Sequence, residues 1–277
     1  MRRSERLVVM TKILTDHPNR IVSLSDFGNE LKAAKSTISE DLAIIRQVFQ
    51  DMKLGKVETI AGAAGGVRYV PLASMEKICR TVGLVCRELA DPQRILPGGF
   101  LYMSDLTSAP DLMTSVGEIF ATRFCDRKPD AVITVEARGI PIALMTARAL
   151  NVPLAIVRRV SRVTEGTVVT MNYVSGSAKR IETMSLSKRA LQPGDRVLAI
   201  DDFMKAGGSA RGLVDLASEF KAEVVGIGVL VETAEPPEKL VKEYESLVVL
   251  ENVDPEKRQI SIRPSRWVTE LMGGGDA

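Results

Sequence analysis

Two adjacent carboxylates, Asp201 and Asp202, follow a run of four apolar residues and come shortly before a pair of glycines. The apolar run predicts a parallel strand that is covered on both faces. Gly207 and Gly208 allow close backbone approach and a positive φ, and Ser209 is placed to cap the helix that we expect next. Because the N–H groups and the dipole at a helix start attract anions, this stretch predicts a pocket for a phosphosugar.

The carboxylates and the phosphate have separate places in this predicted pocket. Acidic side chains repel a phosphate, so Asp201 and Asp202 are expected to accept hydrogen bonds from sugar hydroxyl groups or to hold a hydrated Mg²⁺. Phe203, Lys205 and Ala206 complete the loop, and the Lys205 ammonium would add phosphate affinity without adding a catalytic group. The alternatives are a strand that ends in two solvated aspartates and a lysine that points to water.

A second loop of similar chemistry lies upstream. Residues 131–135 predict a buried strand, and Glu136, Ala137, Arg138 and Gly139 follow it before a helical stretch. Arg138 would supply a positive charge, and Gly139 would let the chain come close to an anion. The alternative is an ordinary turn between a strand and a helix, with Arg138 on the surface.

The elements around these loops predict an α/β domain. A helix is expected over 74–89, and a strand that includes Tyr102 is expected over 100–103. Beyond them, strand-like and helical segments alternate: strands at 131–135, 154–157, 197–200 and 224–231, and helices at 111–124, 141–150 and 209–220. This order is typical of a parallel sheet, whose ligands bind beyond the carboxyl ends of the strands, where both loops would lie.

The first 73 residues have a different pattern. The expected elements are a helix over 4–16, a short helix capped by Ser25, a third helix from Lys35, and strands at 57–60 and 67–70. The third helix carries Ile38, Leu42 and Ile45 on one apolar stripe, while its other side is small and polar. Three helices followed by a hairpin indicate a winged helix-turn-helix, and the alternative is a small α+β cap domain.

Charge and side-chain size in this segment are suited to a nucleic acid. Residues 1–73 hold eleven Lys and Arg against eight Asp and Glu, whereas residues 74–277 hold 26 against 27. Small residues at the front of the third helix would let its first turn enter a major groove. The residues expected to contact DNA are Arg2, Arg3, Lys35, Ser36, Thr37, Ser39 and Arg68. For the N-terminal arginines, the alternative is a solvated chain end.

Composition excludes several other classes. The chain has three cysteines without metal-ligand spacing and one histidine, His17, which argues against disulfide, zinc and Ser-His or Cys-His chemistry. No apolar run reaches the roughly 18 residues that cross a bilayer. We therefore expect a cytoplasmic protein that associates with the nucleoid when it binds DNA.

At these residues the chain resembles known families. The run 197–209 and the loop 136–139 are similar to the phosphoribosyl pyrophosphate (PRPP) and pyrophosphate loops of type I phosphoribosyltransferases. Joined to a winged helix, they make the whole chain resemble the bacterial purine operon repressors. The strings that carry this resemblance are STISEDL (36–42), GAAGGV (62–67), ILPGG (95–99), VTEG (163–166), YVSGS (173–177) and DDFMKAGG (201–208).

The resemblance implies an architecture and a mechanism. It implies a winged helix-turn-helix domain over 1–73 and a type I phosphoribosyltransferase-like parallel-sheet domain over 74–277. A homodimer would bind a double-stranded DNA operator with paired half-sites. PRPP, with or without Mg²⁺, would weaken that binding, and guanosine tetraphosphate (ppGpp) would compete with it. Arg158 and Tyr102 would join the two loops in binding the effector, beneath an extended, mobile excursion over 158–185.

Two functions follow from these observations. The first is a purine-gene regulator that uses a phosphoribosyltransferase-like fold for sensing and has no catalytic residue. The second is a working purine phosphoribosyltransferase with an accessory first domain. We identify no base pocket by residue chemistry, and the basic winged helix favours the regulator.

Overall fold

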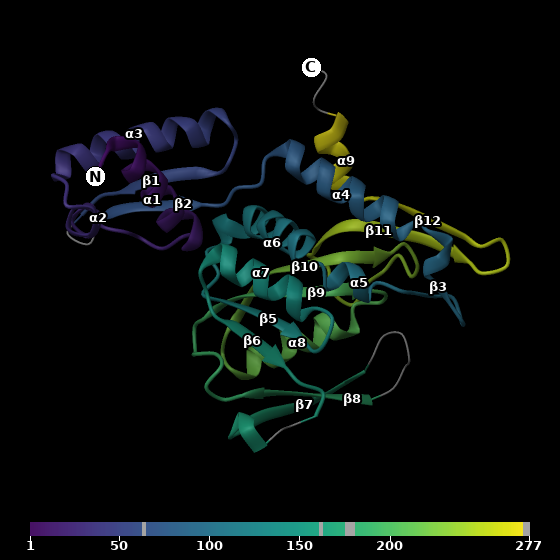
Figure 1. Cartoon of the computed structure of the whole chain (residues 1–277). Helices are drawn as coiled ribbons and strands as arrows, with labels where there is room; N and C mark the ends of the chain where they lie inside the picture. The colour runs from purple at the N-terminus through teal and green to yellow at the C-terminus, as the bar shows by residue number, and fades with distance from the viewer. Residues whose placement is uncertain (63–64, 161–162, 175–180, 274–277) are drawn as a thin grey trace. The chain divides into compact units, whose positions relative to one another are not determined.

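The computed structural model describes residues 1–62, 65–160, 163–174 and 181–273 (Figure 1). The chain divides into two compact units. The first unit comprises Met1–Ser74 and Arg148–Asn151, and the second comprises Met75–Ala147 and Val152–Ala277.

The first unit is a three-helix arrangement with a β-hairpin, as expected of a winged helix-turn-helix. Its elements are α1 (Arg3–Asp16), α2 (Leu24–Leu31), α3 (Lys35–Asp51), β1 (Lys56–Ile60) and β2 (Gly66–Val70). The two strands pair antiparallel. The predicted stripe of α3 faces the core, where Ile38 and Leu42 pack with Phe27 and Met10 from the other two helices. Burial of this stripe orients α3 so that its small polar side is exposed.

The cap predicted for α2 is wrong by two positions. Ser23, not Ser25, precedes the helix, and its hydroxyl accepts a hydrogen bond from the Asp26 N–H at 3.0 Å. The Asp26 carboxylate accepts one from the Ser23 N–H at 3.2 Å. This reciprocal pair needs an acidic residue three positions after the cap, which Ser23 has and Ser25 lacks because Gly28 occupies that place.

The second unit is built around a six-stranded sheet. Its helices are α4 (Met75–Leu89), η1 (Pro92–Arg94), α5 (Ser104–Thr107), α6 (Pro110–Phe124), η2 (Cys125–Arg127), α7 (Ile140–Leu150), η3 (Val163–Glu165), α8 (Gly208–Glu219) and α9 (Arg266–Gly273), of which only the last turn of α7, from Arg148, belongs to the first unit. Its strands are β3 (Ile95–Leu96), β4 (Phe100–Leu101), β5 (Ala131–Val135), β6 (Leu154–Val157), β7 (Val168–Val174), β8 (Ile181–Ser187), β9 (Arg196–Met204), β10 (Glu223–Thr233), β11 (Glu245–Asp254) and β12 (Gln259–Pro264). The strand order is β12-β11-β10-β9-β5-β6.

The central sheet is parallel, as predicted, and carries one antiparallel strand at its edge. Strands β6, β5, β9, β10 and β11 run parallel, whereas β12 pairs antiparallel with β11. The Asp254 carboxylate accepts hydrogen bonds from the N–H groups of Glu256 and Lys257 at 3.0 and 2.9 Å. Such a short turn can only reverse the chain, because a parallel connection needs a crossover of a dozen residues or more.

Helices cover both faces of this sheet, as Figure 1 shows. On one face, α8 packs Leu213 and Leu216 against Ala199 and Ile133 of the central strands. On the other face, α6 brings Phe120 against β10 at Gly228. The strands are therefore buried on both faces, which explains their continuous apolar runs.

Two further segments differ from the expectation. The strand predicted over 100–103 is only Phe100–Leu101, because Met103 already stands before α5. The excursion predicted over 158–185 contains the antiparallel hairpin β7–β8, and the polar segment 175–180 of this prediction lies outside the described residues. Met184 of this hairpin packs against α8 at Gly212, because an apolar residue on every second strand position can face the helix.

None of the described helices combines the length and the apolar character that a membrane span requires.

Candidate functional site

The two predicted loops meet at the carboxyl edge of the sheet. Strands β5 and β9 are parallel neighbours, so the segments that follow them leave the sheet at the same edge. Arg138 stands three residues after β5 ends at Val135. Its Nε lies 3.1 Å from Oδ2 of Asp202, near the end of β9. The structure thus brings the predicted anion-binding arginine and the predicted hydroxyl-binding carboxylate into one ion pair.

Gly139 allows this close approach. A Cβ atom at residue 139 would lie 2.5 Å from Oγ1 of Thr134 and 2.9 Å from Oδ1 of Asp201. Both distances are too short for a side chain, so only glycine lets the β5–α7 loop pass directly over the carboxylate of Asp201.

The two carboxylates have different surroundings. Asp202 is 7% exposed, and its Oδ2 makes the ion pair with Arg138 but no hydrogen bond within the part of the chain that the structure describes. Oδ1 of Asp201 accepts the N–H of Asp202 at 2.9 Å. Burial, and next the negative charge of Asp202, raise the pKa of Asp201 well above its ordinary value. A buried carboxylate oxygen without a donor is a ready acceptor for a hydroxyl group or for a water on a metal ion.

The helix start beyond β9 lacks a side-chain cap. Gly207 stands before α8 with φ +80° and provides no side chain, and Ser209 lies inside the first turn. The prediction that Ser209 caps this helix is therefore wrong, because the left-handed turn at Gly207 starts the helix two residues earlier. The Ser209 hydroxyl interacts with Tyr173 of the β7–β8 hairpin. The first N–H groups of α8 are thus left to an external acceptor such as a phosphate.

The loop between Asp202 and Gly207 is held by a distant segment. Phe203 is half-buried and Lys205 is exposed. The carbonyl oxygens of Lys205 and Ala206 accept hydrogen bonds from the Lys239 ammonium and the Leu240 N–H. Sequence reasoning missed Lys239, because no local motif indicates that a residue 34 positions away reaches this loop.

Arg158, the other predicted phosphate contact, already has two carboxylate partners. Its guanidinium lies 3.0 Å from both Glu136 and Glu165. The hydrogen bonds that Arg158 donates to Glu136 and, next, to Glu165 raise the pKa of Arg158. Arg159 is bound in a similar way, through its N–H to Glu136 at 2.9 Å and its guanidinium to Glu182 at 2.7 Å. An anion that enters here must compete with these carboxylates.

Tyr102, the predicted site residue between α4 and α5, is 43% exposed. Its backbone is fixed, because its N–H donates to the carbonyl oxygen of Arg94 at 2.9 Å. Arg94 in turn pairs with Asp105 at 2.7 Å.

In the first unit, the predicted DNA contacts on α3 lie on its first turn. Lys35, Ser36 and Ser39 are exposed, and Thr37 is half-buried beside the buried Ile38. No side chain caps this helix start. The first turn of α3 therefore presents hydroxyl groups, an ammonium and backbone N–H groups to an approaching anion.

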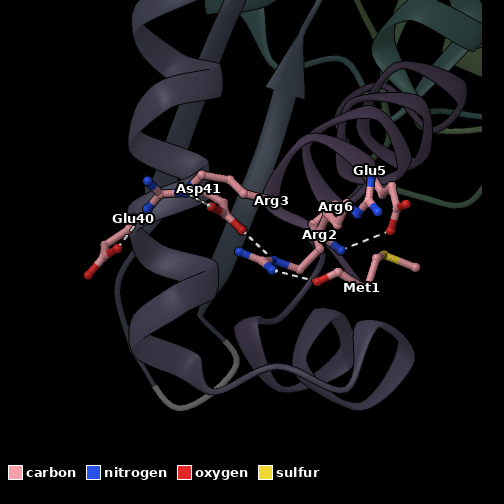
Figure 2. Close-up of polar contacts among 7 residues, drawn as sticks. All are labelled: Met1, Arg2, Arg3, Glu5, Arg6, Glu40 and Asp41. Carbon is pink, nitrogen blue, oxygen red and sulfur yellow. Dashed lines mark hydrogen bonds and ion pairs between the residues drawn. The ribbon is translucent and has the colours of Figure 1, made fainter.

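The arginines near the N-terminus are engaged with α3, as Figure 2 shows. Arg6 and Arg3 lie 2.7 and 3.0 Å from the two oxygens of Asp41, and Arg3 also lies 2.8 Å from Glu40. Arg2 uses its backbone N–H to donate to Glu5 at 2.8 Å. Arg3, predicted to contact DNA, thus also ties α1 to α3.

Sequence reasoning missed the buried position of Asp41, whose side chain is 0% exposed. Burial raises the pKa of Asp41, but the hydrogen bonds and charges of Arg6 and Arg3 outweigh that effect and lower it below its ordinary value. The sequence held one signal for this position. Asp41 stands three residues after Ile38 on the buried stripe, where an acidic residue needs a cationic partner.

Arg68, predicted to reach DNA from the hairpin, is paired with the neighbouring strand. Its Nε and Nη2 atoms donate to one oxygen of Glu58 at 3.0 and 2.9 Å. Lys56 lies 2.9 Å from the other oxygen of Glu58. The described part of the hairpin therefore carries two cations around one carboxylate.

Comparison with known families matches both units. Residues 2–71 match the N-terminal domain of the bacterial purine repressor, and residues 103–260 match the phosphoribosyl transferase domain. The purine biosynthesis transcriptional repressor PurR of Bacillus subtilis (strain 168) is 48% identical over 96% of this chain and 94% of its own. The purine biosynthesis transcriptional activator PurR of Lactococcus lactis subsp. lactis (strain IL1403) is 40% identical over 95% of this chain and 97% of its own.

Enzymes match a smaller part of the chain. A xanthine phosphoribosyltransferase of Lactobacillus delbrueckii subsp. bulgaricus is 39% identical over 50% of this chain and 76% of its own. A solved structure of adenine phosphoribosyltransferase from Rhodothermus marinus is 21% identical, with a TM-score of 0.49, over 60% of this chain and 97% of its own.

Proposed function

Because this chain belongs to the bacterial purine repressor family, we propose that it is a DNA-binding regulator of purine biosynthesis and transport genes whose second domain senses PRPP. The relatives that match nearly its whole length are transcription regulators, whereas the enzyme match covers half of it. The phosphoribosyltransferase fold therefore serves regulation here and not catalysis.

The effector site is the meeting point of the two loops. The observation that carries this assignment is the buried Asp202 carboxylate, whose Oδ2 has no hydrogen-bond donor in the described part of the chain. Hydroxyl groups of the PRPP ribose would donate to Asp202, and its phosphate would accept from the N–H groups at the start of α8. A hydrated Mg²⁺ that accompanies PRPP fits the same carboxylates, Asp201 and Asp202.

Guanosine tetraphosphate is the proposed competitor. It carries diphosphate groups. The N–H groups at the start of α8, which we call the phosphate cradle, and the guanidinium of Arg138 suit these groups as well as they suit PRPP. One anion site with two ligands would let the regulator compare two signals of nucleotide supply.

The DNA site is assigned to residues 1–73 and the effector site to residues 74–277. The exposed first turn of α3 would enter the major groove, with Lys35 on phosphate and Ser36 and Ser39 near base edges. A two-fold homodimer would place two such helices on paired half-sites. Such a regulator works in the cytoplasm, where the nucleoid holds its operators.

Effector and DNA would communicate through linkage. If PRPP binds more tightly to a conformation with low operator affinity, then PRPP must release DNA. Family members include a repressor and an activator. The effect on transcription therefore depends on where the operator lies relative to the promoter, whereas the antagonism between PRPP and DNA is a property of the protein.

The first prediction tests the effector site with Asp202→Asn. This change keeps the shape of the side chain but removes the charge that would accept ribose hydroxyl groups or hold Mg²⁺. We expect PRPP affinity, measured by calorimetry with Mg²⁺, to fall about tenfold or more. Operator affinity without PRPP, measured by gel shift, should stay unchanged.

The matched control is Asp215→Asn on α8, which removes only an exposed ion pair with Arg211. An unaltered PRPP response in Asp202→Asn contradicts the assignment of the site. Release of pyrophosphate from PRPP in the presence of purine bases, at an enzyme-like rate, contradicts the regulator function itself.

A further inference from the structure

The ammonium group of Lys239 lies among backbone carbonyls of the second unit. Its Nζ donates to the carbonyl oxygens of Lys205 at 2.6 Å, Thr233 at 2.6 Å and Pro236 at 2.7 Å. An ammonium has three N–H groups, so all of them are used. One of these carbonyls belongs to the loop that precedes α8, and the other two belong to the end of β10 and the segment after it.

A second contact joins the same two segments. The Leu240 N–H donates to the carbonyl oxygen of Ala206 at 2.9 Å. Gly207 faces this segment as well, because a Cβ atom there would lie 3.3 Å from the Leu240 nitrogen and 3.6 Å from Cβ of Lys239. Residues 239–241 thus lie directly against the loop 205–207.

Because the peptide bond is planar, these contacts determine where the N–H groups of the loop point. In a planar trans peptide, the carbonyl of one residue and the N–H of the next point in opposite directions. The carbonyls of Lys205 and Ala206 point to residues 239 and 240. The N–H groups of Ala206 and Gly207 must therefore point away from that segment.

The next peptide extends this arrangement. The Gly207 carbonyl accepts the Arg211 N–H inside α8 at 2.9 Å. The Gly208 N–H consequently points out of the helix start, where the helix dipole is positive. The directions of three consecutive N–H groups, those of residues 206–208, are thus determined by the hydrogen bonds that the carbonyls of the same peptide groups accept.

We propose that Lys239 is a positioning residue of the phosphate cradle, which holds the Lys205–Ala206 peptide so that the N–H groups of the loop face a phosphate. The role rests on the proposed function, since it concerns how that same site takes the phosphate groups of PRPP. An ammonium suits it because it is a compact charge with three donors, whereas a planar guanidinium cannot direct donors to three carbonyls around one point.

The test compares Lys239→Met with Lys242→Met in the full-length protein. Methionine keeps much of the length of the side chain and removes the three donors, and Lys242 is exposed nearby. With PRPP and Mg²⁺ as the probe, we expect Lys239→Met to lose about tenfold or more in affinity. Lys242→Met should bind PRPP as the wild type does, and operator affinity without PRPP should be unchanged in both.

Chemical rescue distinguishes positioning from general stability. In Lys239→Ala, added methylammonium can donate to the same carbonyls and should restore part of the PRPP affinity, whereas tetramethylammonium, which has no N–H group, should not. Affinity that is unchanged in Lys239→Met, or lost without rescue in Lys239→Ala, overturns the role of Lys239. A wild-type protein that binds neither PRPP nor inorganic pyrophosphate overturns the proposed function instead.

Discussion

At the scale of single residues, the proposed effector site depends on how closely the chain can pass over Asp201. Gly139 leaves no room for a side chain between Thr134 and Asp201. The position of the Asp201 carboxylate, and with it that of the neighbouring Asp202, therefore depends on residue 139 having no methyl group.

Gly139→Ala tests this dependence. The added methyl group must displace Asp201 or the loop, and overpacking of this kind costs about 1–3 kcal/mol. We expect PRPP affinity to fall about tenfold, measured by calorimetry. Gly83→Ala in α4 is the matched control, since a Cβ atom there meets nothing within 4 Å. Equal PRPP affinity in the two variants would show that Asp201 is not constrained by the β5–α7 loop.

Residue-scale chemistry was predictable where it is local. Asp201, Asp202, Gly207 and Gly208 lie close together in the sequence, and the structure places them at one sheet edge. The contacts of Asp41 and Lys239 were not predictable, since their partners Arg6 and Lys205 lie 35 and 34 residues away. Which charged groups meet across such distances depends on packing that a local pattern does not contain.

At the scale of elements, α1 is attached by a buried ion pair to α3, the helix that we propose to face DNA. Arg6 is 12% exposed and Asp41 is 0% exposed, so both charges depend on each other. Removing one member of such a pair typically costs about 3–5 kcal/mol, because the other charge is left buried.

Asp41→Asn should loosen this attachment. We expect the opening free energy of α1 and α3, measured by hydrogen exchange of the full-length protein, to fall by about 3 kcal/mol. Glu40→Gln, which alters only an exposed pair with Arg3, should cost less than about 1 kcal/mol. A similar loss in both variants would show that burial does not matter to the pair.

The pH dependence has a defined sign. The pKa of Asp41 is lowered in the folded protein, so the pair stabilises fully above the ordinary value of 3.8 and loses its effect as pH falls through the folded pKa. Protection of α1 and α3 should therefore fall below about pH 4 in the wild type. In Asp41→Asn this particular loss should be absent.

The salt dependence of DNA binding tests both α3 and the hairpin β1–β2. Lys35→Ala in α3 should flatten the dependence of DNA affinity on salt by about one phosphate contact. Arg68→Ala removes a cation and also exposes Glu58, so it should weaken binding more than Lys35→Ala does. Glu58→Gln should have the opposite effect, with tighter binding and a steeper slope in a gel-shift series at several salt concentrations. If the three variants gave the same slope of DNA affinity against salt concentration, the hairpin would not be part of the DNA interface.

Element types were mostly predictable, whereas their limits were not. Periodicity identified the core helices and the central strands, because each has one consistent apolar pattern. The start of α2 at Ser23 depended on a reciprocal pair with Asp26, and the direction of β12 depended on the turn at Asp254. Such choices are made by one or two hydrogen bonds, which composition does not reveal.

At the scale of the whole molecule, reciprocity follows from linkage. If PRPP lowers operator affinity by a given factor, operator DNA must lower PRPP affinity by the same factor. We expect a factor of about 5–150, measured by titrating PRPP into the free protein and into its operator complex. Unequal factors would show that a further equilibrium, such as dissociation of the dimer, contributes.

Function at this scale was predictable from the combination of parts. A winged helix and a phosphoribosyltransferase-like sheet in one chain indicate a regulator, and the relatives that match almost the whole chain are regulators. Neither part alone separates sensing from catalysis, because both uses need the same carboxylates and the same anion cradle.

The paired arginines beside the proposed effector site would set the range of ligand concentrations over which such a sensor responds. Arg158 and Arg159 already satisfy Glu136, Glu165 and Glu182, so an incoming polyphosphate exchanges internal partners for itself and gains only the difference. Under the proposed function, such a receptor would stay unsaturated at trace concentrations of its metabolite and would respond as the metabolite becomes abundant.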